Sequence, residues 1–303
     1  MRIPEPLHLN DRAIIISPSG NINDYLVHDT SAVLEEWGLI TEISKFALGE
    51  NGRFSGSVEE RLKDLQQAMD HPSIKLIVCS RGGYGLVHLL NKLDFRGIKR
   101  NPKWVIGFSD ITALHSALQV NGIASIHAPM AKHFSNGGVN DLSVRYTKSV
   151  LAGQPINYEI SVNNGISINR FGVAAGKLFG GNLSVLCGLI GTPFLRIPNK
   201  GILFIEDTGE IPYKVDRMLN HLKLAGVFNR ISGLIIGKFT DYDEDDQMYL
   251  PLQESILGVV NEYNFPVAFN FPVGHVNINL PLILGEIAEL LVLKDKVTFK
   301  QFK

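Results

Sequence analysis

Repeated alternation of strand-like and helix-like segments is the feature that most constrains the fold of this chain. Short apolar runs rich in β-branched residues, each ended by turn residues, predict buried strands. They lie at residues 11–17, 74–80, 103–108 and 124–130. Helical patterns separate them, so the sequence predicts a mostly parallel sheet with helices on both faces.

Three helical patterns in this half carry specific expectations. Residues 57–71 have apolar side chains at helical spacing, and Ser57 with Glu60 resembles a capping box. Residues 29–39 predict a helix with Asp29 or Thr30 as N-cap, and residues 86–93 predict a short helix.

The pattern changes near residue 151, where a polar, glycine-dotted stretch begins. We place a domain boundary there, with an N-terminal domain over residues 1–155 and a C-terminal domain over residues 165–303. Strand and helix patterns resume after it, and residues 282–300 predict strands rather than a helix. The sequence as a whole predicts an α/β fold in two domains.

The composition argues against several partners. Lys plus Arg number 29 against 30 Asp plus Glu, which gives no electrostatic case for a nucleic acid or an anionic membrane. The first residues lack the apolar run of a signal peptide, and no apolar run approaches the ~20 residues of a membrane span. Cys79 and Cys187 each lie in an apolar run, as buried free thiols do. We expect a cytoplasmic protein.

Ser109 lies on a tight corner between a predicted strand and a predicted helix, in "KWVIGFSDITALHSAL" (103–118). A hydroxyl there is held at the carboxyl edge of the sheet, where ligands bind, beside backbone N–H groups suited to an oxyanion. The position suits a nucleophile, although Ile111 replaces the second glycine of a G-x-S-x-G elbow. The alternative is a helix N-cap, because serine is among the best caps.

The neighbouring strand ends in "SRGGYG" (80–85), which places Gly82 and Gly83 beside that corner. Flexible backbone with N–H groups could supply the second donor of an oxyanion hole, and a plain strand–helix turn is the alternative. His88 stands where a dinucleotide-binding G-x-G-x-x-G needs its last glycine, so that motif is absent.

His275 is the best candidate for a base, because it follows Gly274 in a loop after a predicted strand. His127 and His133 are weaker candidates. A histidine base needs an acid that orients it. Glu206 and Asp207 end a β-branched strand, where a carboxylate needs a partner such as a histidine N–H.

The acidic stretch "DYDEDD" (241–246) invites a metal interpretation. A calcium-binding EF-hand loop would have glycine at position 246 and glutamate at position 252, but Asp246 and Leu252 stand there. A solvated loop is the better interpretation, so we expect no metal there.

With these pieces in place, the chain resembles the LD-carboxypeptidase family, serine peptidases that include bacterial murein tetrapeptide carboxypeptidase. The likeness runs nearly end to end. It rests on motifs that occur in the family's order: "SRGGYG" (80–85), "WVIGFSDITAL" (104–114), "GGNLSVL" (180–186), "ILFIEDTGE" with "YKVDRMLNHL" (202–222) and "PVGHVNINLPL" (272–282).

The resemblance implies a Rossmann-like N-terminal domain with a mostly parallel sheet and a smaller, mixed α/β C-terminal domain. It implies that Ser109 is the nucleophile and that Glu206 orients His275. It also implies an oxyanion hole made by the backbone N–H groups of Gly83 and Asp110.

The resemblance further implies a cytoplasmic enzyme of murein recycling, whose partner is a murein peptide. Family members remove the terminal D-alanine from L-Ala-D-Glu-diamino acid-D-Ala through an acyl-enzyme, without a cofactor. A second branch cleaves a peptidyl-nucleotide antibiotic and confers immunity to it, and this branch remains the alternative. A third, non-catalytic alternative is a small-molecule binding protein. A homodimer is left open.

Overall fold

The computed structural model describes residues 1–161 and 168–301, which form two compact units. Unit 1 comprises residues 1–154 and 277–285. Unit 2 comprises the described residues of 155–276 and of 286 onward. The expected start of the second domain, residue 165, lies outside the described residues. The sequence pattern gave no sign that residues 277–285 return to unit 1.

Unit 1 is built on a six-stranded sheet. Its strands are β1 (Arg12–Ile16), β2 (Ile40–Ile43), β3 (Ile74–Cys79), β4 (Trp104–Gly107), β5 (Ser125–His127) and β11 (Leu282–Leu284). Their order is β11-β5-β4-β3-β1-β2, and only β11 runs antiparallel to its neighbour. The mostly parallel sheet expected from the alternating pattern is confirmed, with the carboxyl ends of β1, β3 and β4 at one edge.

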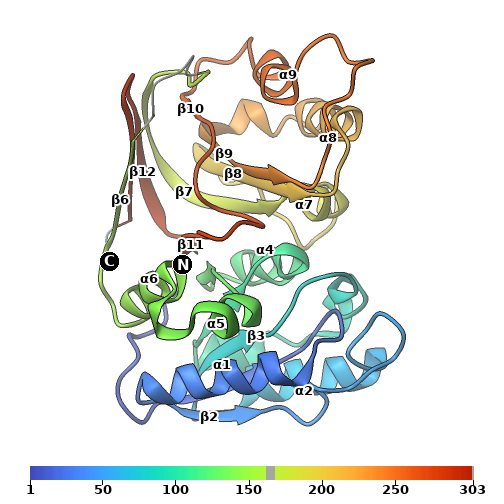
Figure 1. Ribbon diagram of the computed structural model, residues 1–303, viewed down its shortest axis with the longest axis vertical. Helices are drawn as coiled ribbons and strands as arrows, with labels where there is room; N and C mark the ends of the chain where they lie inside the picture. The colour runs from blue at the N-terminus through green and yellow to red at the C-terminus, as the bar shows by residue number, and fades with distance from the viewer. Residues whose placement is uncertain (162–167, 302–303) are drawn as a thin grey trace. The chain divides into compact units, whose positions relative to one another are not determined.

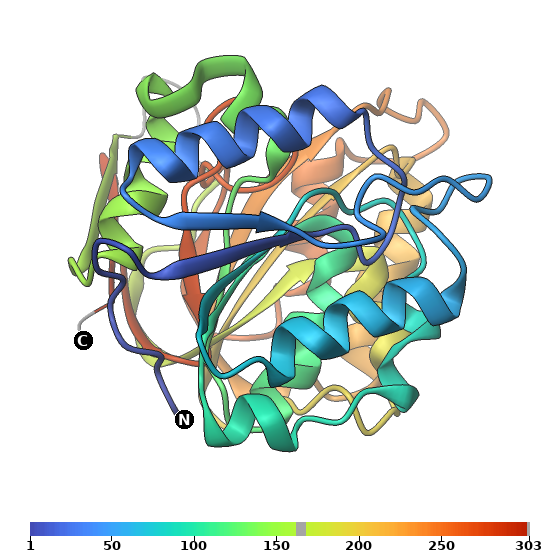
Figure 2. The same cartoon turned by 90° about the horizontal axis from the view of Figure 1, so that it is seen from below.

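Helices cover both faces of this sheet. They are α1 (Asp24–Glu36), α2 (Val58–Asp70), α3 (Arg96–Arg100), α4 (Thr112–Val120), α5 (Ala131–Gly137) and α6 (Leu142–Leu151). Figure 2 shows α1 and α2 on opposite sides of β1 and β2. The capping box of α2 is confirmed: the Ser57 hydroxyl accepts from the Glu60 N–H at 3.2 Å, and the Glu60 carboxylate accepts from the Ser57 N–H at 2.8 Å.

Two local predictions were wrong. Helix α1 begins at Asp24 with Asn23 as N-cap. Both predicted caps, Asp29 and Thr30, lie inside this helix, where the buried Thr30 hydroxyl donates to the Leu26 carbonyl. Residues 86–93 form two 3₁₀ helices, η1 (Leu86–His88) and η2 (Leu90–Lys92), instead of one α-helix. Buried Leu86 and Leu89 are three residues apart, which is one turn of a 3₁₀ helix.

Unit 2 contains a seven-stranded sheet (Figure 1). Its strands are β6 (Ile156–Ser161), β7 (Gly172–Asn182), β8 (Gly201–Thr208), β9 (Ile231–Thr240), β10 (Val267–Ala268), β12 (Ile287–Val292) and β13 (Lys296–Gln301). The order is β10-β9-β8-β7-β12-β13-β6. Strands β10 to β7 are parallel and β7 to β6 are antiparallel, so the long strand β7 joins the two halves.

Helices α7 (Leu183–Leu189), α8 (Pro212–Leu224) and α9 (Leu252–Val259) cover the parallel half. Their apolar residues share one core with strands β7 to β10, in which Leu219 and Ile256 pack with Leu203 and Leu234. The expected fold class, a Rossmann-like domain followed by a smaller mixed α/β domain, is confirmed.

Two smaller expectations concern cysteines and membrane spans. Both cysteines are free; Cys79 is buried as expected, whereas Cys187 is partly exposed. No helix in the described part of the chain is both long enough and apolar enough to cross a membrane.

Candidate functional site

Ser109 occupies a strained backbone position directly after β4. Its φ is 62°, in the left-handed region, which costs a residue with a side chain about 1–2 kcal/mol. The short 3₁₀ helix η3 (Ser109–Ile111) that starts here has Phe108 as N-cap, and no side chain caps it. The N-cap interpretation of Ser109 is therefore wrong. A strained, partly exposed serine between a strand and a helix has the local backbone of a nucleophile elbow.

The glycine turn after β3 lies against this serine. A Cβ atom on Gly82 would lie 2.7 Å from the Ser109 Cβ and 2.9 Å from its Oγ, so a side chain at position 82 would displace the serine. Gly83 has a φ of 97°, a conformation that favours glycine. Among the described residues, neither the Gly83 nor the Asp110 backbone N–H donates to a backbone carbonyl in a turn or loop.

Three polar side chains surround this corner inside unit 1. The buried carboxylate of Asp110 accepts hydrogen bonds from the Ser19 hydroxyl at 2.6 Å and the Leu86 N–H at 2.9 Å. Arg61 on α2 is also buried and donates to the carbonyls of the adjoining loops. We did not identify Ser19 or Arg61 from the sequence. Arg61 lies one turn before Leu65 on the buried side of α2. A charged residue at a position where the helical pattern predicts burial could have identified it.

His275 and Glu206 form a hydrogen-bonded pair inside unit 2. The distance from His275 Nδ1 to Glu206 Oε2 is 2.8 Å, and the glutamate side chain is fully buried. Gly274 makes this approach possible, because its φ is 118° and a Cβ there would lie 2.9 Å from the same carboxylate oxygen. An ionised glutamate accepts, so Nδ1 carries the hydrogen and Nε2 is the basic nitrogen of the neutral ring.

The carboxylates near His275 determine the direction in which its pKa is shifted. Burial lowers the pKa of His275, but the hydrogen bond and charge of Glu206, with the charges of Asp207 and Asp241, outweigh it. The net result is a pKa above the ordinary 6.5. The carboxylates thus stabilise the imidazolium that a general base becomes.

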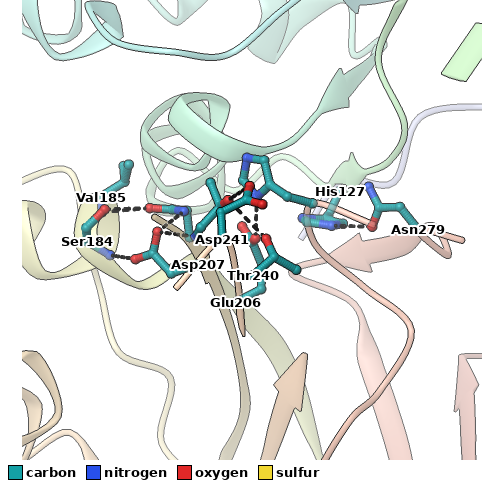
Figure 3. A network of polar contacts seen from close by, with 11 residues as sticks. His127, Ser184, Val185, Glu206, Asp207, Thr240, Asp241 and Asn279 are labelled. Atoms are coloured by element: carbon teal, nitrogen blue, oxygen red, sulfur yellow. Dashed lines mark hydrogen bonds and ion pairs between the residues drawn. The ribbon is translucent and has the colours of Figure 1, made fainter. Parts of the chain in front are cut away.

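Asp207, the residue after Glu206, joins the end of β8 to the start of α7 (Figure 3). Its carboxylate accepts from Asn182 Nδ2 at 2.8 Å, the Ser184 N–H at 2.8 Å and the Thr208 N–H at 2.9 Å. Burial raises the pKa of Asp207 to about 6, although these hydrogen bonds oppose the shift. Asp207 therefore fixes the end of β8 to the start of α7. Its hydrogen bonds go to Asn182, Ser184 and Thr208, not to the His275 ring.

The remaining candidates have other partners. In unit 1, His127 Nε2 lies 3.0 Å from Asn279 Oδ1, and both side chains are buried (Figure 3). In the acidic loop of unit 2, Glu244 accepts from the Leu252 N–H at 2.9 Å, as a local turn contact. In residues 1–161 and 168–301 no group of three or more His, Cys, Asp or Glu side chains could hold a metal ion.

Each half of the predicted site is thus assembled within one unit. Unit 1 brings Ser109, Gly83 and Asp110 to one corner at the carboxyl edge of its sheet. Unit 2 brings Glu206 and His275 into direct contact. The arrangement offers a strained hydroxyl with nearby backbone N–H groups in one unit, and an oriented base in the other.

The sequence profile of the LD-carboxypeptidase N-terminal domain matches residues 14–128, and that of the C-terminal domain matches residues 175–290. The murein tetrapeptide carboxypeptidase of Pseudomonas aeruginosa is 30% identical over 285 residues, which cover 88% of this chain and 89% of the other.

Two solved structures are also similar. The muramoyltetrapeptide carboxypeptidase from Oxalobacter formigenes is 26% identical, with a TM-score of 0.88 over 96% of this chain and 99% of its own. The microcin C7 self immunity protein MccF is 23% identical, with a TM-score of 0.87 over 99% of both chains, and this likeness concerns the fold alone.

Proposed function

Because the chain belongs to the LD-carboxypeptidase family, we propose that it is a serine peptidase that removes the terminal D-alanine from a murein tetrapeptide. The substrate is L-Ala-D-Glu-diamino acid-D-Ala, and the reaction belongs to cytoplasmic cell-wall recycling. The names of the relatives from P. aeruginosa and O. formigenes support the substrate class.

The proposed reaction passes through an acyl-enzyme. The Ser109 Oγ attacks the carbonyl carbon of the third residue while His275 Nε2 takes the hydroxyl proton. The backbone N–H groups of Gly83 and Asp110 stabilise the oxyanion. The imidazolium then gives its proton to the leaving nitrogen of D-alanine, and the C–N bond breaks. Water attacks the ester with His275 again as base, which regenerates the serine and releases the tripeptide.

The strained backbone of Ser109 is the observation that carries this proposal. A φ of 62° costs energy in any residue with a side chain, and Ser109 does not use the position to cap a helix. Gly82 lies so close that a side chain there would displace the hydroxyl. Both features are expected of a hydroxyl held for attack and have no purpose in a plain turn.

The stereochemistry of the product tests the proposal. A tetrapeptide ending in D-alanine should be cleaved, and the same peptide ending in L-alanine should be cleaved at least tenfold more slowly. Inverting that α-carbon exchanges the directions of the methyl and the carboxylate, so donors built for the carboxylate lose their partner. An unpaired buried donor costs about 1–3 kcal/mol, which corresponds to roughly ten- to hundredfold discrimination.

The experiment offers both peptides at equal concentration and quantifies the released alanine by chiral chromatography. Ser109→Ala serves as the matched control and should release neither. Equal release of D- and L-alanine would remove the murein assignment. Activity retained by Ser109→Ala would remove the serine mechanism and favour a site elsewhere.

The alternative within the same chemistry is hydrolysis of an acylated nucleotide antibiotic. The likeness to MccF favours it only at the level of the fold. Incubation with an aminoacyl sulfamoyl adenosine and chromatography of the products separates the two. Cleavage of that conjugate without release of D-alanine from the tetrapeptide would favour the immunity function.

A further inference from the structure

Asp110 has a buried carboxyl group that the proposed chemistry does not use. Only 4% of the residue is exposed, although it directly follows the nucleophile. Burial raises the pKa of Asp110, while hydrogen bonds from Ser19 and Leu86 and the charges of Arg61 and His88 oppose the rise. A carboxylate in such a place is destabilising unless its hydrogen bonds are made.

Those hydrogen bonds join three separate segments of unit 1. Ser19 lies in the loop after β1, and its hydroxyl donates to Asp110 Oδ2 at 2.6 Å. Leu86 begins η1, three residues after Gly83, and its N–H donates to the same oxygen at 2.9 Å. One carboxylate oxygen therefore ties the Ser109 corner to both neighbouring strand-end loops.

Arg61 on α2 links the same two loops. Its Nη1 donates to the Pro18 carbonyl at 2.8 Å and to the Gly85 carbonyl at 3.0 Å. The Gly20 N–H also donates to the Gly82 carbonyl at 2.9 Å. These contacts hold the two loops to each other. The Asp110 side chain then fixes both loops to the backbone beside Ser109.

We propose that Asp110 is a positioning residue. Its carboxylate holds the glycine turn (residues 82–85) at a fixed place relative to Ser109, so that the N–H groups of Gly83 and Asp110 converge on one substrate oxygen. The inference rests on the proposed function and adds a side-chain role to a residue that otherwise contributes only its backbone. Oxyanion donors act through distance and angle, so a small displacement of the turn removes most of their effect.

The chain contains a matched control for this role. Asp64 is also 4% exposed, and its Oδ2 accepts from the Ser44 hydroxyl at 2.6 Å and from the Phe46 N–H at 2.8 Å. The two carboxylates thus have the same exposure and the same kinds of donor. Asp64 ties α2 to the loop after β2 and not to the nucleophile corner.

The test compares Asp110→Ala with Asp64→Ala in the full chain. Each change removes two equivalent hydrogen bonds, so both variants should lose similar stability. Asp110→Ala should lower kcat about a hundredfold, the usual effect of losing one oxyanion donor, with KM changed less than about threefold. Asp64→Ala should keep the kcat of the wild type. Asp110→Asn should recover most of the loss, because an amide oxygen can accept from both donors.

A tetrahedral mimic provides a second measurement. A peptide aldehyde forms an adduct with the serine that carries an oxyanion, so its inhibition constant should rise in Asp110→Ala by the factor that kcat/KM falls. Affinity for the tripeptide product should stay unchanged. If Asp110→Ala does not fold, the milder pair Ser19→Ala and Ser44→Ala makes the same comparison, with an expected tenfold loss in the former only.

Two failures are distinguishable. If the wild-type chain releases no D-alanine, or Ser109→Ala still does, the proposed function fails. If the wild type is active, Ser109→Ala is not, and Asp110→Ala behaves like Asp64→Ala, only the positioning role fails. A loss confined to KM would also overturn it.

Discussion

At the scale of single residues, Gly82 and Ser109 constrain each other. We expect Gly82→Ala to fold but to lose most activity, about a hundredfold in kcat, because the new Cβ would lie 2.7 Å from the Ser109 Cβ and displace the nucleophile. Steady-state kinetics and thermal unfolding would measure both effects. Gly188→Ala is the control, since a Cβ there meets no atom within 4 Å. Full activity of Gly82→Ala would contradict the assignment of Ser109 as the nucleophile.

The titration of His275 gives a second prediction at this scale. The base must be neutral, so kcat/KM should fall as the pH drops through a pKa above 6.5. Glu206→Gln removes the main contribution that raises this pKa, so the acid limb should move to lower pH, together with a lower plateau. Asp207→Asn should move the limb less, because Asp207 contributes only through its charge and less than Glu206 does. An acid limb that stays in place in Glu206→Gln would rule out this pair as the base.

At the scale of elements, Asp207 links the end of β8 to the start of α7, and its titration should be visible in stability. The folded chain holds this proton up to a pH of about 6, whereas the unfolded chain loses it near 3.8. The folded state therefore binds more protons between these values, and stability falls as the pH rises through that window. The expected change is on the order of 2–3 kcal/mol.

Urea unfolding of the wild type and Asp207→Asn at several pH values between 4 and 7 would measure this contribution. The difference in the free energy of unfolding between the two should shrink, or reverse in favour of the variant, as the pH rises. A difference that stays constant across the window would show that Asp207 has an ordinary pKa in the folded chain.

The sequence predicted elements wherever local pattern and tertiary packing agree. Strands β1, β3, β4 and β5, helix α2 with its capping box, and the C-terminal strands all follow from apolar periodicity and cap chemistry. The glycine turn and the Ser109 corner were predicted as a strand-end cluster, because parallel strands end at one edge. The hydrogen bonds of Asp110 were not predictable, since they join residues 19, 86 and 110, which are distant along the chain.

Strand β11 was predicted as a strand, but the sheet to which it belongs was not. Its three residues, Leu282–Leu284, read as a strand, but an apolar run does not say which sheet it joins. Only the structure shows that it pairs with β5, with Leu282 opposite His127. The sequence pattern had already singled out His275 as the base, and the family resemblance chose Glu206 over Asp207 as the acid.

At the scale of the whole molecule, the proposed triad draws on both units. Ser109→Ala, His275→Ala and Glu206→Ala should each lower kcat by at least about a thousandfold while the chain stays folded. Residues that act as one unit give non-additive losses, so the double variant Ser109→Ala/His275→Ala should be little worse than either single one. Release of D-alanine over a long incubation would measure this. Losses that multiply would mean that the two residues act in separate steps or sites.

The return of residues 277–285 to unit 1 limits how the gene can be divided. A fragment that stops at residue 154 would contain every strand of the first sheet except β11 and would leave β5 with an open edge, available to pair with another copy. A fragment that begins at residue 155 would carry those nine residues with no sheet to join. The coding sequences of the two units therefore cannot be separated by one cut between residues 154 and 155. Recombination there would give one fragment prone to aggregate and another with an unpaired internal segment.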